Sequence, residues 1–98
     1  MFLKVLKTYR DVVAVCDKEI LGKRFEEGNF QLDVKESFFK GNSVTEEEAI
    51  EIMRQKRAED ATFNIIGQKA VNAALIAGII SEEEVGEIQN IPFALVLI

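Results

Sequence analysis

The chain has 98 residues, of which 48% are hydrophobic and 30% are charged, with six glycines and a single proline. A chain of this length and balance folds as one globular domain with an ordinary core, so disordered, collagen-like and linker-rich chains are excluded. We therefore predict a single domain over residues 1–98.

Missing residue types exclude several chemistries. The sequence has no histidine and no tryptophan, and Cys16 is its only cysteine. Ser-His-Asp and Cys-His catalytic sets therefore cannot form, and one cysteine builds neither an intrachain disulfide nor a Cys/His zinc site. A carboxylate site for a hard metal ion stays open by composition, and the glutamate triplets at residues 46–48 and 82–84 are the candidates. Consecutive glutamates on a helix point in different directions, however, and helix capping explains both triplets. We predict no metal and no cofactor, and the composition favours a protein that is not an enzyme.

The sequence predicts a cytoplasmic protein without membrane association. No uninterrupted apolar run reaches the ~18 residues that a membrane-spanning helix needs. Residues 63–80 have about this length but contain Asn64, Gln68, Lys69 and Asn72. The first residues, MFLKVLKTYRD, have positive charges without the apolar segment and cleavage site of a signal peptide. Disulfides are rare in the cytoplasm, and a lone cysteine agrees with that compartment.

Charge is unevenly distributed along the chain, whose formal net charge is −5. The basic N-terminal segment, residues 1–24, carries six Lys or Arg against three Asp or Glu. Residues 25–98 carry six against fourteen. An acidic body disfavours DNA binding, whereas the basic segment leaves a local RNA-binding patch open.

The first half of the chain predicts strands. Residues 2–8 and the β-branched run at 12–16 predict two strands that form an antiparallel hairpin. A loop or single helical turn follows at 17–22, and another turn at 25–29. Residues 30–34 alternate apolar and polar side chains, which predicts a third strand.

The second half predicts helices. Thr45 and Glu48 match a capping box, in which each side chain bonds the backbone N–H of the other, and this predicts a helix ending near Ala58. Ser81 and Glu84 match a second capping box, which predicts a short helix that ends near Gly86.

Residues 63–80 predict a helix buried between layers. We expect Asn64 as its N-cap, with a stop of the Schellman type in which Gly78 is left-handed and Ile79 is its apolar partner. Residues 93–98, FALVLI, predict a final strand that is covered on both faces or pairs into an interface. The predicted fold is a single α+β domain, with a mixed or mostly antiparallel sheet of about four strands covered by two or three helices.

Three segments carry a resemblance to a known family: AVCDKEILGK at residues 14–23, FEEGNFQLDVKESFFKG at 25–41 and NIIGQKAVNAALIAGII at 64–80. In this order and spacing they make the chain similar, over essentially its whole length, to the archaeal domain-of-unknown-function family 424. The resemblance implies a small archaeal cytoplasmic protein and no agreed activity. It also implies a link to translation-factor gene neighbourhoods, and so a protein or ribonucleoprotein partner from the translation machinery.

The loop after the second predicted strand carries chemically active side chains. It offers a thiol, two carboxylates, and a glycine beside a lysine that could hold an anion. The alternative interpretation is an inert buried cysteine that ends a strand, followed by a solvated turn. The tentative ligand-binding residues of this loop are Cys16, Asp17, Glu19, Gly22 and Lys23.

The start of the helix predicted in residues 63–80 completes the candidate site. Free backbone N–H groups, a glycine that permits close approach and a nearby lysine are typical of a general anion site. The tentative residues are Asn64, Gly67 and Lys69. In the alternative interpretation, Gly67 permits close packing of the helix on the sheet and Lys69 faces solvent. If a site exists, it should lie where this helix start meets the loop at residues 16–23.

Three functional hypotheses follow. The first is a non-catalytic binding or accessory module, associated with translation or RNA. The second is a small-ligand binder or enzyme that holds an anionic ligand between the loop and the helix start. The third is a structural homodimer, formed through residues 93–98 or through the Phe38–Phe39 pair.

Overall fold

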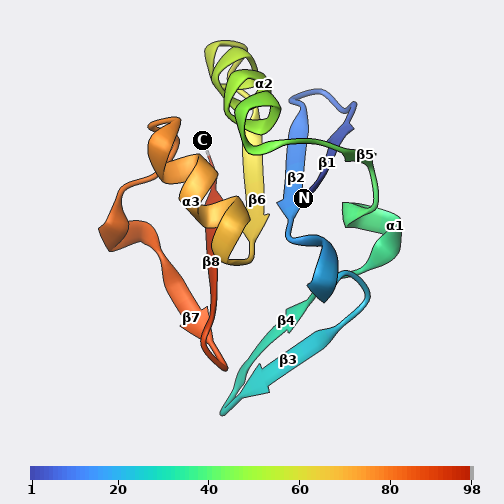
Figure 1. The fold of residues 1–98 in the computed structure, drawn as a ribbon, viewed down its shortest axis with the longest axis vertical. Helices are drawn as coiled ribbons and strands as arrows, with labels where there is room; N and C mark the ends of the chain where they lie inside the picture. The colour runs from blue at the N-terminus through green and yellow to red at the C-terminus, as the bar shows by residue number, and fades with distance from the viewer. Residues whose placement is uncertain (98) are drawn as a thin grey trace.

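A six-stranded mixed sheet forms the centre of the domain, in the order β5-β1-β2-β6-β8-β7 (Figure 1). The structure is a computed structural model and describes residues 1–97. Neighbouring strands are antiparallel except β2 and β6, which run parallel. The strands are β1 (Phe2–Leu6), β2 (Val12–Cys16), β5 (Asn42–Ser43), β6 (Thr62–Ile66), β7 (Gly86–Ile88) and β8 (Ile91–Val96).

Smaller elements and helices complete the α+β domain. Two further strands form a separate antiparallel hairpin, which projects from one end of the domain in Figure 1. They are β3 (Arg24–Glu27) and β4 (Phe30–Asp33). The helices are α1 (Glu36–Phe39), α2 (Glu46–Ala58) and α3 (Gln68–Ile76), with 3₁₀ turns η1 (Lys18–Ile20) and η2 (Glu82–Glu84). The predicted fold class is confirmed.

The sheet separates two apolar clusters. On one face, Phe63 and Ile65 of β6 pack with the buried sides of α2 and α3. On the other, Cys16 and Ile66 pack with η1, α1 and the β3–β4 hairpin. In β6 the buried Phe63 and Ile65 alternate with the half-buried Thr62 and Asn64, because the second face of the strand is covered only at its end, near Ile66.

The predicted signals at Thr45, Gly78 and Ser81 are confirmed. The Thr45 N–H donates to Glu48 Oε1 at 2.8 Å, and the Glu48 N–H donates to Thr45 Oγ1 at 3.1 Å. Gly78 has a φ of +75°, and the Ile79 N–H donates to the Ala74 carbonyl oxygen at 2.9 Å. This is the Schellman pattern expected for the end of α3. The capping box at Ser81 is also present, but it opens only the 3₁₀ turn η2.

The prediction of one helix through residues 63–80 is wrong at its start. Residues 62–66 form strand β6, and Gly67, not Asn64, is the N-cap of α3. The strand pairs with β2 on one side and β8 on the other. The partners in these hydrogen bonds are distant in sequence, so a local sequence pattern cannot predict the strand.

Other strands were also missed. Residues 25–29, expected as a turn, contain most of β3 and the tip of its hairpin with β4. Residues 86–88 form β7 instead of the end of a helix, and a turn at Gln89 and Asn90, both with positive φ, connects β7 to β8. The main sheet therefore has six strands, compared with the expected four.

The final strand is confirmed as β8 over residues 93–96 of the predicted 93–98, and Ile98 lies outside the described residues. The strand is not covered on both faces. Its side chains alternate from buried Ala94 to Leu95, which is 55% exposed, and Leu97 just beyond the strand is 71% exposed. The hairpin and α1 therefore leave part of the sheet face opposite α2 and α3 open to solvent.

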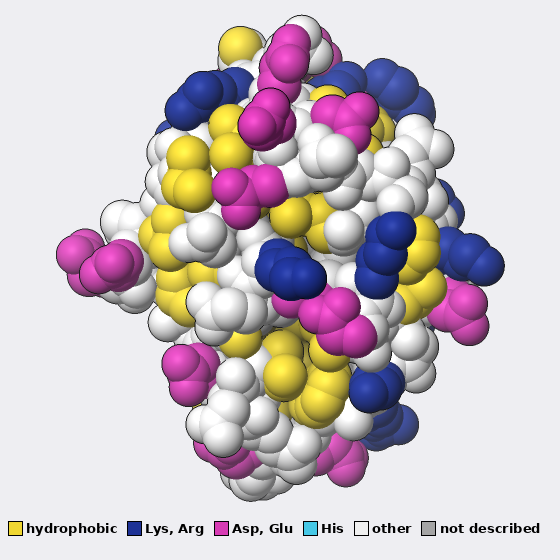
Figure 2. Space-filling view, in the orientation of Figure 1, with side chains coloured by type: hydrophobic (Ala, Val, Ile, Leu, Met, Phe, Trp, Pro, Cys, Tyr) yellow, Lys and Arg dark blue, Asp and Glu magenta, His cyan; other side chains and the backbone are white. Residues whose placement is uncertain are grey.

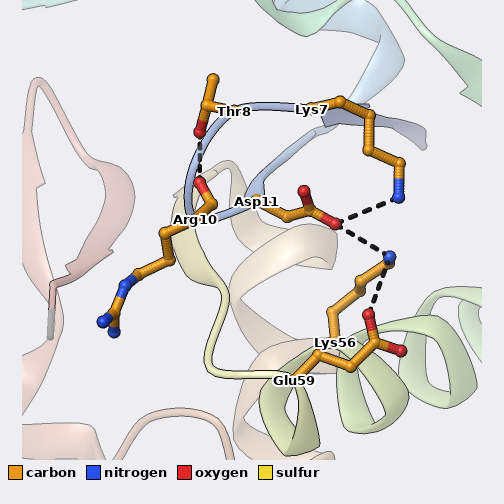
Figure 3. Close-up of polar contacts among 6 residues, drawn as sticks. All are labelled: Lys7, Thr8, Arg10, Asp11, Lys56 and Glu59. Atoms are coloured by element: carbon orange, nitrogen blue, oxygen red, sulfur yellow. Dashed lines mark hydrogen bonds and ion pairs between the residues drawn. The ribbon is translucent and has the colours of Figure 1, made fainter.

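Polar contacts fix the β1–β2 turn to the end of α2 (Figure 3). Asp11 Oδ2 lies 3.1 Å from Lys56 Nζ and 3.1 Å from Lys7 Nζ. Lys56 also pairs with Glu59, and within the turn the Thr8 hydroxyl donates to the Arg10 carbonyl oxygen. Hydrogen bonds from Lys56 and then Lys7 hold the pKa of the Asp11 carboxyl below its ordinary value, and the bond to Asp11 raises the pKa of Lys56.

This network predicts an acid-sensitive contribution to stability. Because the pKa of Asp11 is depressed in the folded state, its contribution is complete above the ordinary value of 3.8 and is lost as the pH falls through the lower folded value. We expect Asp11→Asn to destabilise the protein at neutral pH and the difference from wild type to shrink below pH 3.8. Urea unfolding across pH measures this difference, and a gap that widens on acidification would contradict the prediction.

Candidate functional site

The side chain of Asp17 closes the start of α3. Asp17 Oδ2 accepts the Lys69 N–H at 3.0 Å, and Oδ1 accepts the Ala70 N–H at 2.8 Å. The carboxylate is buried, with only 4% of the residue exposed. A carboxylate at this position satisfies two N–H groups that have no partner within the helix and also complements the positive end of the helix dipole.

The parallel pairing of β2 and β6 brings these residues together. Cys16 is opposite Ile66 in the register, so Asp17 and Gly67 leave the same edge of the sheet side by side. The Asp17 N–H continues the ladder by donating to the Ile66 carbonyl oxygen at 3.2 Å. Side chains at the carboxyl ends of adjacent parallel strands meet in this way in many α/β sites.

Gly67 makes the contact possible. Its φ of +114° is a conformation that side-chain-bearing residues rarely adopt. A Cβ atom on Gly67 would lie 2.4 Å from Asp17 Cγ and 2.6 Å from Oδ1. The absence of a side chain therefore lets the carboxylate reach the helix.

In the structure, a side chain of the protein itself occupies the predicted anion-binding position. The Lys69 and Ala70 N–H groups already hold Asp17, so an external anion would have to displace this carboxylate. The side chain of Lys69 is exposed. Ligand binding by this set of residues stays a prediction, while the juxtaposition of Asp17, Gly67 and Lys69 is observed.

The remaining predicted residues are spread around this contact. Cys16 is fully buried, and burial, followed by the nearby Asp17 charge, raises the pKa of its thiol to about 11. Glu19, Gly22 and Lys23 are exposed on the loop that leads to β3. Asn64 is half-buried in β6 and alternates with Phe63 and Ile65, so it faces away from α3. The structure does not bring Asn64 to the helix start.

Sequence reasoning missed a surface groove between α2 and α3. The α2–α3 groove has a volume of about 560 Å³, and its lining residues are Glu47, Ile50, Glu51, Arg54, Gln55 and Ile76. The sequence held one signal for it, since Ile50 lies beside the apolar stripe that packs α2 on the sheet. Nothing in the sequence showed that Ile76, at the end of another helix, would lie next to it.

Residues 1–97 contain neither a metal-binding cluster nor a membrane-spanning helix. No group of three or more Cys, Asp or Glu within this part of the chain could hold a metal ion. None of the helices described there is long and apolar enough to span a membrane.

Comparisons with known proteins agree with the resemblance seen in the sequence. The family described as "Protein of unknown function (DUF424)" matches residues 7–98. The fold is similar to the "Crystal structure of an uncharacterized conserved protein from Methanopyrus kandleri", with 26% sequence identity and a TM-score of 0.87. That alignment covers 97% of this chain and 88% of the other. A search of curated proteins gave no match.

The contact between Gly67 and Asp17 predicts non-additive mutations. We expect Gly67→Ala to cost about 3 kcal/mol or more, from backbone strain and the steric clash together. Gly78→Ala is the control, because it has a φ of +75° with no atom within 4 Å of a new Cβ, and it should cost about 1–2 kcal/mol.

A double-mutant cycle locates the clash. In an Asp17→Ala background the Cγ and Oδ1 atoms are gone, so Gly67→Ala should cost about 1 kcal/mol less than it does in wild type. Denaturant unfolding of the four proteins measures this coupling. The Cβ of residue 17, 2.9 Å from a Cβ on residue 67, stays in both backgrounds, so strictly additive costs would mean that Asp17 Cγ and Oδ1 do not restrict residue 67.

The raised pKa of Cys16 predicts an unreactive thiol. At pH 8 a thiol with a pKa of about 11 is about one-thousandth thiolate, compared with about a quarter for an unfolded cysteine. We expect native Cys16 to react with Ellman's reagent about a hundredfold or more slowly than the urea-unfolded chain. Comparable rates would show that the thiol is accessible and activated in the native protein.

Proposed function

The chain belongs to the DUF424 family, and we propose that it is a non-catalytic module that binds a protein partner. The observation that carries this proposal is the occupied start of α3, where Asp17 accepts the N–H groups of Lys69 and Ala70. The position that the sequence indicated as the most plausible ligand site, the start of α3, therefore makes a structural contact within the chain. The thiol of Cys16 is likewise buried, with a pKa raised to about 11.

The positions of the basic side chains favour a protein partner over an RNA partner. Five of the six cations of the basic N-terminal segment, all except Lys23, contact groups of the same chain within residues 1–97, and they are spread over several elements. These contacts include Lys4 Nζ with the Ser37 carbonyl oxygen at 2.9 Å, Lys7 Nζ with Asp11 Oδ2 at 3.1 Å, Lys18 Nζ over the Phe2 ring at 5.4 Å and Arg24 Nη2 with Gln31 Oε1 at 2.7 Å. An RNA site needs cations gathered on one surface and free to meet phosphates.

The tip of the β3–β4 hairpin supplies a surface for a partner. Phe30 lies beside the turn of this hairpin and is 71% exposed. The hairpin is held in place, because Gln89 donates through its N–H to Glu27 Oε1 at 2.9 Å and through Nε2 to the Glu26 carbonyl oxygen at 2.7 Å. A fixed, exposed aromatic side chain is typical of the anchors that dominate protein interfaces. We extend the proposal to a partner from the translation machinery, as the family resemblance implies.

Affinity capture tests the proposal. The tagged protein is used to capture partners from a lysate of a related archaeon, with and without nuclease, and mass spectrometry identifies them. We expect nuclease-resistant enrichment of a protein, reduced at least tenfold by Phe30→Ala, because truncating an interface anchor costs about 2 kcal/mol or more. Tyr9→Ala is the matched control, an aromatic with 103% relative exposure in the β1–β2 turn at the opposite end of the domain (Figure 1).

Other outcomes are equally informative. Enrichment that disappears with nuclease would mean that RNA bridges the contact. If nothing is enriched, the proposal fails, and a thermal-shift screen of phosphorylated metabolites would test the anionic-ligand hypothesis with Lys69→Ala as its control.

A further inference from the structure

The α2–α3 groove has an apolar floor that the domain leaves open. Ile50 of α2 is half-buried there, and Ile76, the last residue of α3, is 52% exposed. An isolated exposed apolar residue needs no explanation, but these two lie in one groove between two helices. A groove of this kind accepts a helix that packs its ridge of side chains between the two helices.

The charges along the exposed side of α2 change sign from one end to the other. Glu47 and Glu51 lie one turn apart, and Arg54 follows toward the C-terminus, with the exposed Ala58 one turn further on. Among residues 1–97, neither glutamate pairs with a Lys or Arg. Arg54 donates to the Ile76 carbonyl oxygen at 3.3 Å through one of its five N–H groups, which leaves others free. In the upper part of Figure 2, hydrophobic side chains lie among both acidic and basic ones.

We propose that the α2–α3 groove is a self-association site, in which α2 of a second copy packs antiparallel to α2 of the first. A twofold axis across the middle of the helix places Arg54 of each copy against the Glu47–Glu51 stripe of the other. The contact is isologous, so each complementary pair occurs twice. Ile50 and Ile76 of both copies become buried beneath these pairs. The inference is independent of the proposed function.

Charge complementarity selects this occupant. A nucleic acid would meet two unpaired carboxylates, and an acidic helix would meet them too. Among the helices of residues 1–97, α2 carries an acidic half, an apolar residue and a basic half in the required order. A pair of helices of 13 residues each buries less area than the roughly 1,200–2,000 Å² of a standard interface. The dimer should therefore be a weak one, with a dissociation constant of about 10–1,000 µM.

Charge reversal gives a test that does not depend on the exact register. The acid-reversed variant carries Glu47→Lys and Glu51→Lys, and the base-reversed variant carries Arg54→Glu. Each variant alone presents like charges across the twofold axis, so each should dimerise at least tenfold more weakly than wild type. Mixed together, one copy presents only cations and the other only carboxylates, so a heterodimer at least as tight as the wild-type dimer should form.

Sedimentation equilibrium of the intact chain measures these constants, over a range from about 10 µM to 1 mM. Circular dichroism first confirms that each variant is folded. Glu82→Lys with Glu83→Lys, and separately Lys40→Glu, are the charge-matched controls at exposed sites outside the groove, and they should leave dimerisation within about twofold of wild type.

Two substitutions of exposed apolar residues distinguish a dimer formed through the groove from one formed through the open sheet face. Ile76→Ser removes a 52% exposed side chain from the groove, and Leu95→Ser removes a 55% exposed side chain from β8. We expect only Ile76→Ser to weaken the dimer. A wild-type chain that stays monomeric at 1 mM, a mixture of reversed variants that fails to associate, or a dimer that depends on Leu95 and not on Ile76 would each overturn the proposal.

Discussion

The buried carboxylate of Asp17 joins the two halves of this domain. Asp17 directly follows β2, and its carboxylate accepts the N–H groups that begin α3. Ala70 is fully buried, so its N–H cannot bond to water. Leaving one such group without a partner costs about 1–3 kcal/mol, a sizeable share of the 5–15 kcal/mol that a domain of this size has in total.

The same contact limits what the domain can do. The end of a parallel strand pair beside a helix start is where α/β proteins commonly bind anions, and here the fold fills that position with its own side chain. The nearest reactive group, the thiol of Cys16, is buried against this carboxylate, whose charge further disfavours a thiolate. The Asp17 carboxylate and the Cys16 thiol are thus both buried in the interior of the domain. The hairpin tip around Phe30, the α2–α3 groove and the open sheet face at Leu95 stay exposed.

The sequence predicted local features better than distant ones. The capping box at Thr45 and the left-handed Gly78 were correct because each is decided by residues within one or two helical turns. Strand β6 was missed because Ile65 and Ile66 fit a buried helix as well as a buried strand, and only the hydrogen bonds of β2 and β8 decide between them.

The candidate site could also be predicted only in part, because it combines a local feature with a contact between residues distant in sequence. Gly67 was correctly identified as a residue that permits close approach, but the atom that approaches it belongs to Asp17, 50 positions earlier in the chain. The meeting of the Asp17 loop with the helix start was anticipated. The role of Asn64 was not, because in a strand it faces the opposite side of the sheet from Phe63 and Ile65.

Helix α2 shows how a device that stabilises one helix can also create a surface for association. Its first turn carries Glu46, Glu47 and Glu48 and its last turn carries Lys56 and Arg57, an arrangement that complements the helix dipole. Any helix charged in this way is complementary to an antiparallel copy of itself. Most such helices do not pair, because exposed ion pairs contribute only about 0–1 kcal/mol each. What distinguishes α2 is the apolar floor formed by Ile50 and Ile76, whose burial would supply the free energy that the charges alone lack, while the charges fix the antiparallel orientation.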